Sequence, residues 1–395
     1  MAIPGLDELL AAGVRGRRVF VRADLNVPLE AGQIRDDTRL RASLPTLEKL
    51  LAAGARVVLA SHLGRPKGER KPEQSLRPLA PRLAERLGVG VSFCEDCVGD
   101  LARDAVSALG DGQLLLLENL RFHEGEEKND PDFSRSLAAL CDDYVNDAFG
   151  TAHRAHASTA GMVPLAKRVA AGDLLRAELE HLRAVLEPAR PLLVVLGGAK
   201  VSDKLAVLEA LAPHADCLAV GGAMAYTFLA ARGEPVGRSL VEADRIEDAR
   251  SVERRAADAG RRLLLPVDHV VAERLDAAAA TRVVERIPEG WMGVDIGPRT
   301  AERYADEARR AATVFWNGPM GVFEIDAFAA GTRSVAAGMA ECRGVTIVGG
   351  GDSLAAVNQL GHAAAMTHLS TGGGASLEFI QGLVLPGVAA LERKP

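Results

Sequence analysis

LLVVLGGAKVSDKLAVLEAL, residues 192–211, joins five apolar residues, a glycine pair, two lysines and a segment with helical apolar spacing. This order predicts a buried strand, a tight turn and a helix that begins near Lys204. Similar turns follow apolar runs at Arg18–Arg22, Val57–Ala60, Leu114–Leu117, Leu192–Leu196, Leu218–Val220, Thr313–Trp316 and Val345–Val348. Short apolar runs that alternate with helices indicate parallel sheets covered on both faces, so we expect an α/β fold.

Length and composition restrict the class of protein. A chain of 395 residues predicts two domains of about 200 residues each. Its 48% hydrophobic and 25% charged residues are typical of globular proteins, and its net charge of −6 disfavours nucleic acid as the main partner. The start lacks a secretory signal, and no apolar run approaches the length of about 18 residues that a membrane span needs.

The two halves of the chain differ in their predicted strand-end loops. Arginine and histidine dominate these loops up to about residue 165, and glycine clusters dominate them from about residue 190. Between the halves, one helical stripe is formed by Leu175, Leu179, Leu182 and Leu186. Pro188 and Pro191 end this predicted helix, which we interpret as the connector between the domains.

The turn GGAKVSDK has the features of a phosphate site. Gly197 and Gly198 let a ligand approach the backbone, while Lys200 and Lys204 add positive charge near a helix start. The alternative is a tight turn with solvated lysines. The spacing differs from a Walker A loop, and no cluster in the chain matches GxGxxG.

Three further loops in the second half carry polar groups. In GGGDS, Asp352 could hold Mg²⁺ and Ser353 could cap a helix over Leu354–Leu360, although both could serve as caps alone. In TGGGAS, residues 371–376, backbone N–H groups could donate hydrogen bonds to an oxyanion, or the segment could be a flexible turn. In NGPMGVFE, Glu324 could bind a ribose or be a simple loop residue.

The first half predicts an anion site. Its strand-end loops carry Asp24, Asn26, Arg39, His62, Arg65, Arg121 and Arg154. A parallel sheet brings such loops to one edge, where four guanidinium groups would repel one another unless an anion lay between them. Each arginine taken singly could be a surface charge. His153 and His156 lack an evident third metal ligand.

The five cysteines form an odd set without a regular disulfide framework, which favours a reducing compartment. Cys94 and Cys97 form a CxxC pair. A zinc site would need a second ligand pair, and none stands at a suitable spacing, so we interpret this pair as structural rather than as a metal or redox site.

Eight motifs together resemble the phosphoglycerate kinase family, in that family's order. They are DLNVP, SHLGRP, LLENLRF, NDAFGTAHRAHAS, LGGAKVSDK, WNGPMGVFE, GGGDS and STGGGASLEF, from about residue 18 to 380. The resemblance implies two Rossmann-like domains joined by a hinge helix. It also implies a glycolytic kinase, a phosphotransferase with a carboxyl acceptor, that uses Mg²⁺ to interconvert 1,3-bisphosphoglycerate and ADP with 3-phosphoglycerate and ATP.

The resemblance also implies a domain division and site residues. The 3-phosphoglycerate domain would comprise residues 1–170 and a C-terminal tail of about 381–395, and the nucleotide domain residues 171–380 with connecting helix 174–187. The 3-phosphoglycerate site would contain Asp24, Asn26, Arg39, His62, Arg65, Arg121 and Arg154. The nucleotide site would contain Gly198, Ala199, Lys200, Lys204, Gly222, Asn317, Pro319, Glu324, Gly350, Gly351, Asp352 and Ser353.

Roles within these sites follow from the same resemblance. Lys200 and Arg39 resemble the residues that meet the transferring phosphoryl group, and Asp352 resembles the Mg²⁺ contact. The family further implies a cytoplasmic, hinge-bending enzyme, which we expect to be a monomer. Departures from the family's common residues occur at Ala23, Leu25, Asp173 and Ala223.

Two other classes of function were weighed against the kinase. A non-catalytic binding protein on the same scaffold would be expected to lack Lys200, Arg39 or Asp352, and all three are present. A nicotinamide-dependent dehydrogenase would be expected to carry GxGxxG and a later acidic residue, which this chain does not.

Overall fold

The computed structural model describes residues 3–30 and 32–392. By the density of its internal contacts the chain divides into two units, residues 1–179 with 384–395, and residues 180–383. Within the described residues, no helix combines the length and apolar character needed to cross a bilayer. Each unit contains one six-stranded parallel sheet, so the predicted α/β class and parallel sheets are confirmed.

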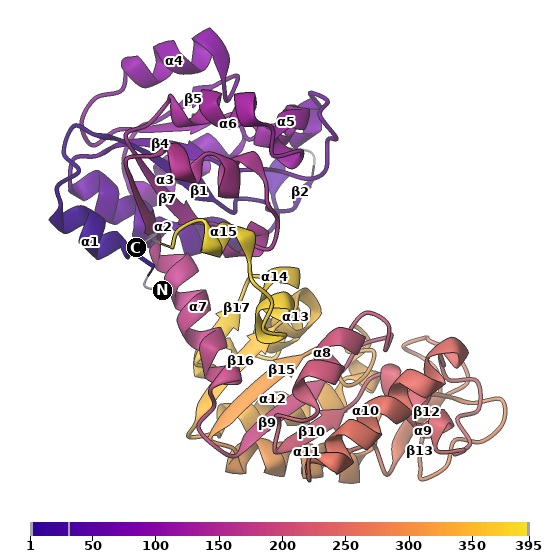
Figure 1. Ribbon diagram of the computed structural model, residues 1–395. Coiled ribbons are helices and arrows are strands. Elements are labelled where there is room, and N and C mark those ends of the chain that lie inside the picture. The colour runs from indigo at the N-terminus through magenta and orange to yellow at the C-terminus, as the bar shows by residue number, and fades with distance from the viewer. Residues whose placement is uncertain (1–2, 31, 393–395) are drawn as a thin grey trace. The chain divides into compact units, whose positions relative to one another are not determined.

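The sheet of the N-terminal unit has the order β5-β6-β4-β1-β7-β8 (Figure 1). Its strands are β1 (Arg18–Ala23), β4 (Arg56–Ala60), β5 (Val91–Cys94), β6 (Leu114–Leu117), β7 (Asp143–Asp147) and β8 (Arg168–Ala171). The chain moves outward from β1 to one edge and then returns to β7 on the other side of β1. Because parallel crossovers are right-handed, this reversal places helices on both faces and leaves a ligand crevice beyond the strand ends.

Before the connecting helix, the helices of this unit are α1 (Leu6–Ala11), α2 (Thr38–Ala52), α3 (Leu79–Leu87), α4 (Gly99–Ser107), α5 (Glu124–Glu127) and α6 (Pro131–Ala138). Among them, α2 and α3 bury leucine-rich faces. The core under α2 and α3 includes Leu40, Leu47, Leu79 and Leu83, none of which has exposed surface. A two-stranded ribbon, β2 (Leu29–Glu30) with β3 (Gln33–Ile34), precedes α2.

The C-terminal unit has a sheet of order β11-β10-β9-β15-β16-β17. Its strands are β9 (Leu192–Leu196), β10 (Cys217–Val220), β11 (Arg262–Leu264), β15 (Thr313–Asn317), β16 (Val345–Gly349) and β17 (His368–Ser370). Its helices are α8 (Leu205–Leu211), α9 (Met224–Ala231), α10 (Ile246–Asp258), α11 (Pro298–Arg310), α12 (Ala330–Ala340), α13 (Gly351–Gln359) and α14 (Gly374–Ile380). Trp316 is completely buried at the centre of this core.

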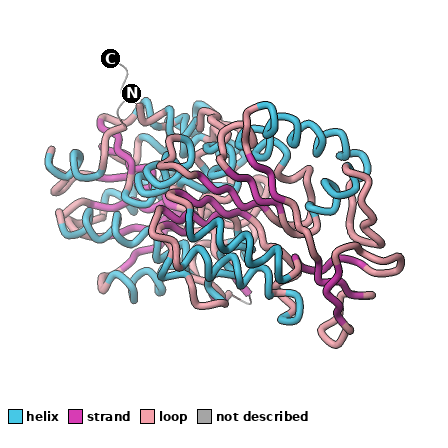
Figure 2. The backbone as a smooth tube through the Cα atoms, turned by 90° about the horizontal axis from the view of Figure 1, so that it is seen from below, coloured by secondary structure: helices cyan, strands magenta, loops and turns pink. Residues whose placement is uncertain are grey.

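A second sheet in this unit is antiparallel and has the order β13-β12-β14. It consists of β12 (His269–Ala272), β13 (Thr281–Val284) and β14 (Met292–Ile296), and Figure 2 shows its strands apart from the main sheet. The sequence patterns did not predict it. Its outer strand β13 is exposed over Thr281–Val283, so it lacks a buried apolar run such as that of β9.

The connecting helix is α7 (Asp173–Leu186), close to the expected 174–187. Its first turn is held by the Asp147 carboxylate, which accepts hydrogen bonds from the N–H groups of Leu174 at 2.9 Å and Leu175 at 3.2 Å. The boundary between the units falls inside this helix, at residue 179, rather than at residue 170. The predicted stripe is wrong at its last member, because Leu186 is 41% exposed and Val185 is buried instead.

The C-terminal segment from residue 384 belongs to the N-terminal unit. Figure 1 shows its helix α15 (Pro386–Ala389), coloured yellow, against the indigo and magenta ribbon of that unit. The Gly387 N–H donates to Ala152 O at 2.8 Å, and Asn146 Nδ2 donates to Gly387 O at 3.3 Å. Leu385 and Leu391 are buried on either side of this contact.

Candidate active site

Four neighbouring strands of the N-terminal unit end at one edge of its sheet. The register pairs Arg22 of β1 with Ala60 of β4 on one side and with Asn146 of β7 on the other. Strand β6 continues this row beyond β4. The loops that follow these strands therefore start side by side. Together with the first turn of α2, which holds Arg39, they carry the seven polar residues that the sequence singled out.

A buried polar cluster lies directly beneath these loops. The completely buried Arg22 donates from Nε to Ser158 Oγ at 2.8 Å, and its Nη2 lies 3.2 Å from His62 Nδ1. Ser158 Oγ in turn donates to Glu126 at 2.6 Å. The sequence patterns did not single out Arg22 or Glu126, because neither a charge at the end of an apolar run nor one in an acidic stretch shows which groups it contacts.

The electrostatic field of this cluster is strongly positive. Burial, with the charges of Arg22, Arg121 and Arg39, lowers the pKa of His62 well below its usual range. Burial, with the charges of Arg121, Arg22 and Arg154, lowers the pKa of His156 to about 3.

The arginines also repel one another. Burial and the neighbouring Arg22 lower the pKa of Arg121 to about 10, although Glu127 opposes the shift. His62 and His156 are neutral at pH 7, so the positive charge of this cluster comes from its guanidinium groups.

The remaining predicted residues of this edge differ in exposure. Asp24 is buried and accepts a hydrogen bond from Arg39 Nη1 at 2.8 Å, which orients that half-exposed guanidinium. Asn26 Oδ1 accepts from the Gly64 N–H at 2.9 Å and so joins two of the loops. Arg65 is exposed, while Arg154 is half-buried and donates to His153 Nε2 at 3.1 Å.

Three glycine turns meet at the corresponding edge of the C-terminal sheet, after β9, β10 and β15. The Gly198 N–H donates to Pro319 O at 3.0 Å, and the Gly222 N–H donates to Met320 O at 3.0 Å. A Cβ on Gly197 would lie 2.1 Å from Pro319 O, and one on Gly222 would lie 2.5 Å from Gly198 N and O. The turns therefore pack backbone against backbone, which residues larger than glycine would prevent.

Lys204 is tied to the end of β15. Its Nζ donates to Asn317 O at 2.8 Å and also contacts Asn317 Oδ1. Burial lowers the pKa of Lys204 to about 8, although the carboxylates of Asp352 and Asp203 act in the opposite direction. Lys200 is exposed. Although burial acts in the opposite direction, hydrogen bonds from Ser202 and the charge of Lys200 lower the pKa of Glu242.

A cavity of about 230 Å³ opens between these turns. Six residues that the sequence singled out line it: Gly198, Ala199, Gly222, Pro319, Glu324 and Asp352. The other lining residues were not predicted and are Ala223, Tyr226, Gly293, Val294, Met320, Gly321 and Val322. Several come from the antiparallel sheet or its surroundings, so only the tertiary fold brings them to the glycine turns. The walls combine backbone, apolar side chains and two exposed carboxylates, a lining that suits an amphiphilic ligand.

The loop after β16 leads into α13 through Gly350 and Gly351. Gly350 has a φ of +91° and occupies the N-cap position of α13, and Asp352 follows in the first turn. The prediction that Ser353 caps this helix is wrong. Ser353 lies inside α13, completely buried, and its hydroxyl accepts a hydrogen bond from the Gly318 N–H at 2.6 Å. It therefore links the β16 loop to the β15 turn.

The third glycine cluster, TGGGAS, connects β17 to α14. Gly373, with a φ of +55°, precedes α14, and Ser376 Oγ lies 2.6 Å from Ser370 Oγ within the unit's interior.

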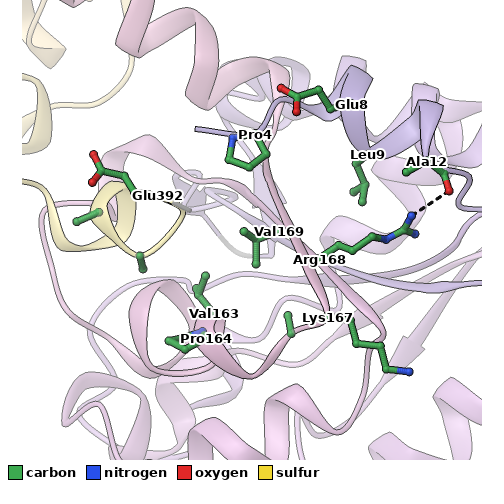
Figure 3. A pocket seen from close by; sticks show the side chains of 13 residues that line it. Pro4, Glu8, Leu9, Ala12, Val163, Pro164, Lys167, Arg168, Val169 and Glu392 are labelled. Carbon is green, nitrogen blue, oxygen red and sulfur yellow. Dashed lines mark hydrogen bonds between the residues drawn. The ribbon is translucent and has the colours of Figure 1, made fainter. Parts of the chain in front are cut away.

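Another cavity, of about 820 Å³, lies near α1 and α15 of the N-terminal unit (Figure 3). Its lining includes none of the predicted site residues. Arg168, which borders it, is engaged by Asp143 and by the carbonyl groups of Ala12 and Gly13.

Comparisons with known proteins agree with this architecture. The family model described as phosphoglycerate kinase matches residues 9–383. A phosphoglycerate kinase of Anaeromyxobacter dehalogenans is 56% identical over 398 residues, covering 99% of this chain and 100% of the relative, and one of Acaryochloris marina is 53% identical with 98% of each covered. The solved structure of phosphoglycerate kinase from Coxiella burnetii superimposes with a TM-score of 0.90 at 41% identity, covering 99% of both chains.

Proposed function

Because this chain belongs to the phosphoglycerate kinase family, which transfers a phosphoryl group reversibly between 1,3-bisphosphoglycerate and ADP, we propose that its two polar sites divide this reaction. The N-terminal strand-end loops bind the phosphoglycerate, and the glycine turns of the C-terminal unit bind the nucleotide. The observation that carries this proposal is the pair of sites itself: a positive cluster on one unit and a glycine-lined cavity on the other.

The phosphoglycerate side is built to hold an anion. Its guanidinium groups are crowded enough to lower the pKa of Arg121, and a phosphate or carboxylate between them would relieve that repulsion. Charge-assisted hydrogen bonds of this kind are worth about 1.5–3 kcal/mol each. The residues that we assign to this site are Asp24, Asn26, Arg39, His62, Arg65, Arg121 and Arg154.

The nucleotide side uses backbone and ammonium groups. The N-terminal end of α13, which begins after Gly350, offers main-chain N–H groups to phosphates, and Lys204 supplies a charge held beside Asn317. Glu324, on the wall of the cavity, is placed to accept hydrogen bonds from a ribose. The assigned residues are Gly198, Ala199, Lys200, Lys204, Gly222, Asn317, Pro319, Glu324, Gly350, Gly351, Asp352 and Ser353.

The residues around Asp352 fit a Mg²⁺ ion that arrives with the nucleotide. Asp352 is exposed, borders the cavity and lies in the first turn of α13. Mg²⁺ commonly takes one or two protein carboxylates and completes its shell with phosphate oxygens and water. When bound, the ion would neutralise charge on the phosphate oxygens.

Transfer itself requires position and charge rather than covalent help from the protein. We assign Arg39 and Lys200 to the equatorial oxygens of the phosphoryl group in flight. Asp24 orients Arg39 for this role, and the exposed Lys200 is free to follow the group. Because the two substrates bind to different units, the units must close around them, which also excludes water from the acyl phosphate.

Substitution of the two transfer residues tests these roles. Arg39→Ala and Lys200→Ala are each expected to lower kcat on the order of 10³-fold, by analogy with the loss of an arginine finger. A coupled assay with ATP, 3-phosphoglycerate and Mg²⁺ measures this. Arg41→Ala is the matched control, because Arg41 lies on the same helix and pairs with Asp37 at the surface.

Near-normal kcat in either variant would refute its assigned role. Absence of turnover in the folded wild-type protein would instead favour a binding protein.

We further propose a cytoplasmic monomer. The five free cysteines, four of them buried, suit a reducing compartment.

A further inference from the structure

Three potential metal ligands from two loops converge in the N-terminal unit, apart from the groups assigned to substrate. Asp96 and Cys97 follow β5, and His123 follows the turn Leu120–Phe122 after β6. Strands β5 and β6 are neighbours, with Cys94 opposite Leu117, so their following loops start together. The Cys97 sulfur, a His123 nitrogen and an Asp96 oxygen all lie within 4.8 Å of one another.

We propose that Asp96, Cys97 and His123 form a binding site for a transition-metal ion of the zinc class. One thiolate, one imidazole and one carboxylate are a donor set that Zn²⁺ accepts, whereas Mg²⁺ prefers oxygen ligands alone. Two negative ligands and a neutral imidazole would balance the ion's two positive charges. A solvent water can fill the fourth position.

The geometry requires only small movements. Zinc bonds of about 2.0–2.3 Å place tetrahedral ligand atoms roughly 3.3–3.7 Å apart. The three ligand atoms lie within 4.8 Å of one another, so the widest separation between them would have to shorten by about an ångström. Asp96 Oδ1 lies 2.7 Å from His123 Nε2. This hydrogen bond already holds the two side chains toward each other, and an entering ion would replace it.

The three ligands differ in exposure, so an ion can reach the buried thiol from the solvent side. Cys97 is 1% exposed, whereas the side chains of Asp96 and His123 are 27% and 33% exposed. The His123 ring is fixed against Phe133, with ring centroids 5.3 Å apart. Arg70 Nη2 lies 3.5 Å from Asp96 Oδ2, and this long contact can be replaced by a contact between the carboxylate and the ion.

The same surroundings disfavour a redox role for the CxxC pair. Burial raises the pKa of both Cys94 and Cys97, and nearby carboxylates, Asp96 and Glu126 among them, raise that of Cys97 further. A low-pKa thiolate is what makes such a motif reactive, and neither cysteine has one. A bound cation would take the place of the Cys97 proton, which leaves to solvent.

Titration with Co²⁺, a spectroscopic substitute for Zn²⁺, tests the proposal on the full chain in excess Mg²⁺. One equivalent of Co²⁺ is expected to give a thiolate-to-metal charge-transfer band. Cys97→Ser should abolish the band, while Asp96→Asn and His123→Gln should weaken Co²⁺ binding at least tenfold, since even the loss of outer-shell partners costs about 10–100-fold. Zn²⁺ should displace Co²⁺ from the wild type.

Cys342→Ser is the control for adventitious thiol binding, because Cys342 is the most accessible of the five cysteines and lies in the other unit. It should keep the band. If Cys97→Ser fails to fold, His123→Gln decides, since that side chain is one-third exposed. The proposal is overturned if the wild type gives no band, if His123→Gln binds Co²⁺ as the wild type does, or if Cys342→Ser loses the band.

Discussion

Lys204 shows how one partly buried charge sets conditions on ligand binding. The folded chain holds its ammonium group away from water, and this burial lowers the pKa to about 8. An anionic diphosphate favours the protonated form, so we expect ADP affinity to fall as the pH rises through about 8. The loss should reach at most about tenfold per pH unit.

The same group should affect stability in the opposite direction. Its folded pKa lies below the value of about 10.4 for an unfolded lysine, so the unfolded chain binds more protons between those values. The ligand-free protein should therefore gain stability from Lys204 as the pH rises from about 8 to about 10.

Calorimetric titration with ADP and thermal unfolding across this pH range measure both trends. Lys204→Met should remove both, whereas Lys200→Met, at an exposed lysine, should keep the stability trend. An ADP affinity that does not change with pH across this range in the wild type would contradict the assignment of Lys204 to the phosphates.

At the scale of the element, the glycine turns of the C-terminal unit can be tested by a matched pair. Gly222 and Gly260 both have a φ of +66°, but a Cβ on Gly222 would meet Gly198 at 2.5 Å, and one on Gly260 would meet nothing within 4 Å. Gly260→Ala should cost about 1–2 kcal/mol from backbone strain alone. Gly222→Ala should cost about 1–3 kcal/mol more through overpacking and should also raise the KM for ADP.

Thermal unfolding and nucleotide kinetics distinguish the two variants. Equal melting temperatures and equal KM values would show that the turns do not depend on close backbone packing. A raised KM in Gly260→Ala would show that strain anywhere in the unit disturbs the nucleotide site.

Elements were predicted from the sequence more accurately than contacts. Several buried strands were located because short apolar runs identify a parallel sheet, as for Leu114–Leu117 and Leu192–Leu196, whose bounds agree with the structure. Five strands of the parallel sheets, β5, β7, β8, β11 and β17, were not located, because they lack such a run; the buried β7 has the sequence DYVND. Strand β13 was missed because exposed strands lack that pattern. Ser353 was misassigned because its hydroxyl contacts Gly318, 35 positions away, and sequence adjacency gave only the local alternative.

The candidate site shows the same contrast between local patterns, which the sequence predicts, and tertiary contacts, which it does not. Loop chemistry identified the polar residues at the strand ends, and the structure places Gly198, Gly222 and Asp352 around one cavity. Tyr226 and Gly293 could not be predicted, since no local pattern connects an ordinary helix residue with a distant antiparallel sheet. His123 likewise stands 26 positions from Cys97, so no short metal motif includes both.

At the scale of the whole molecule, the proposed division of substrates between two units predicts a change of shape during the reaction. Small-angle scattering should show a smaller radius of gyration with both substrates present than with either alone. The free energy for closure comes from ligand contacts made only in the closed state. An unchanged radius of gyration with both substrates bound would refute closure.

The path of the chain has a consequence for its synthesis. Residues 384–392 complete the N-terminal unit, yet they follow residues 180–383 in the chain and leave the ribosome after them. The N-terminal unit therefore waits for the second unit to be made, and the Ala152 carbonyl and the Asn146 amide lack Gly387 until that residue has been synthesised. A truncated chain would lack the buried Leu385 and Leu391, so an incompletely synthesised enzyme would carry a defective first unit. Quality-control proteases that recognise exposed apolar surface could distinguish such a chain from the finished protein.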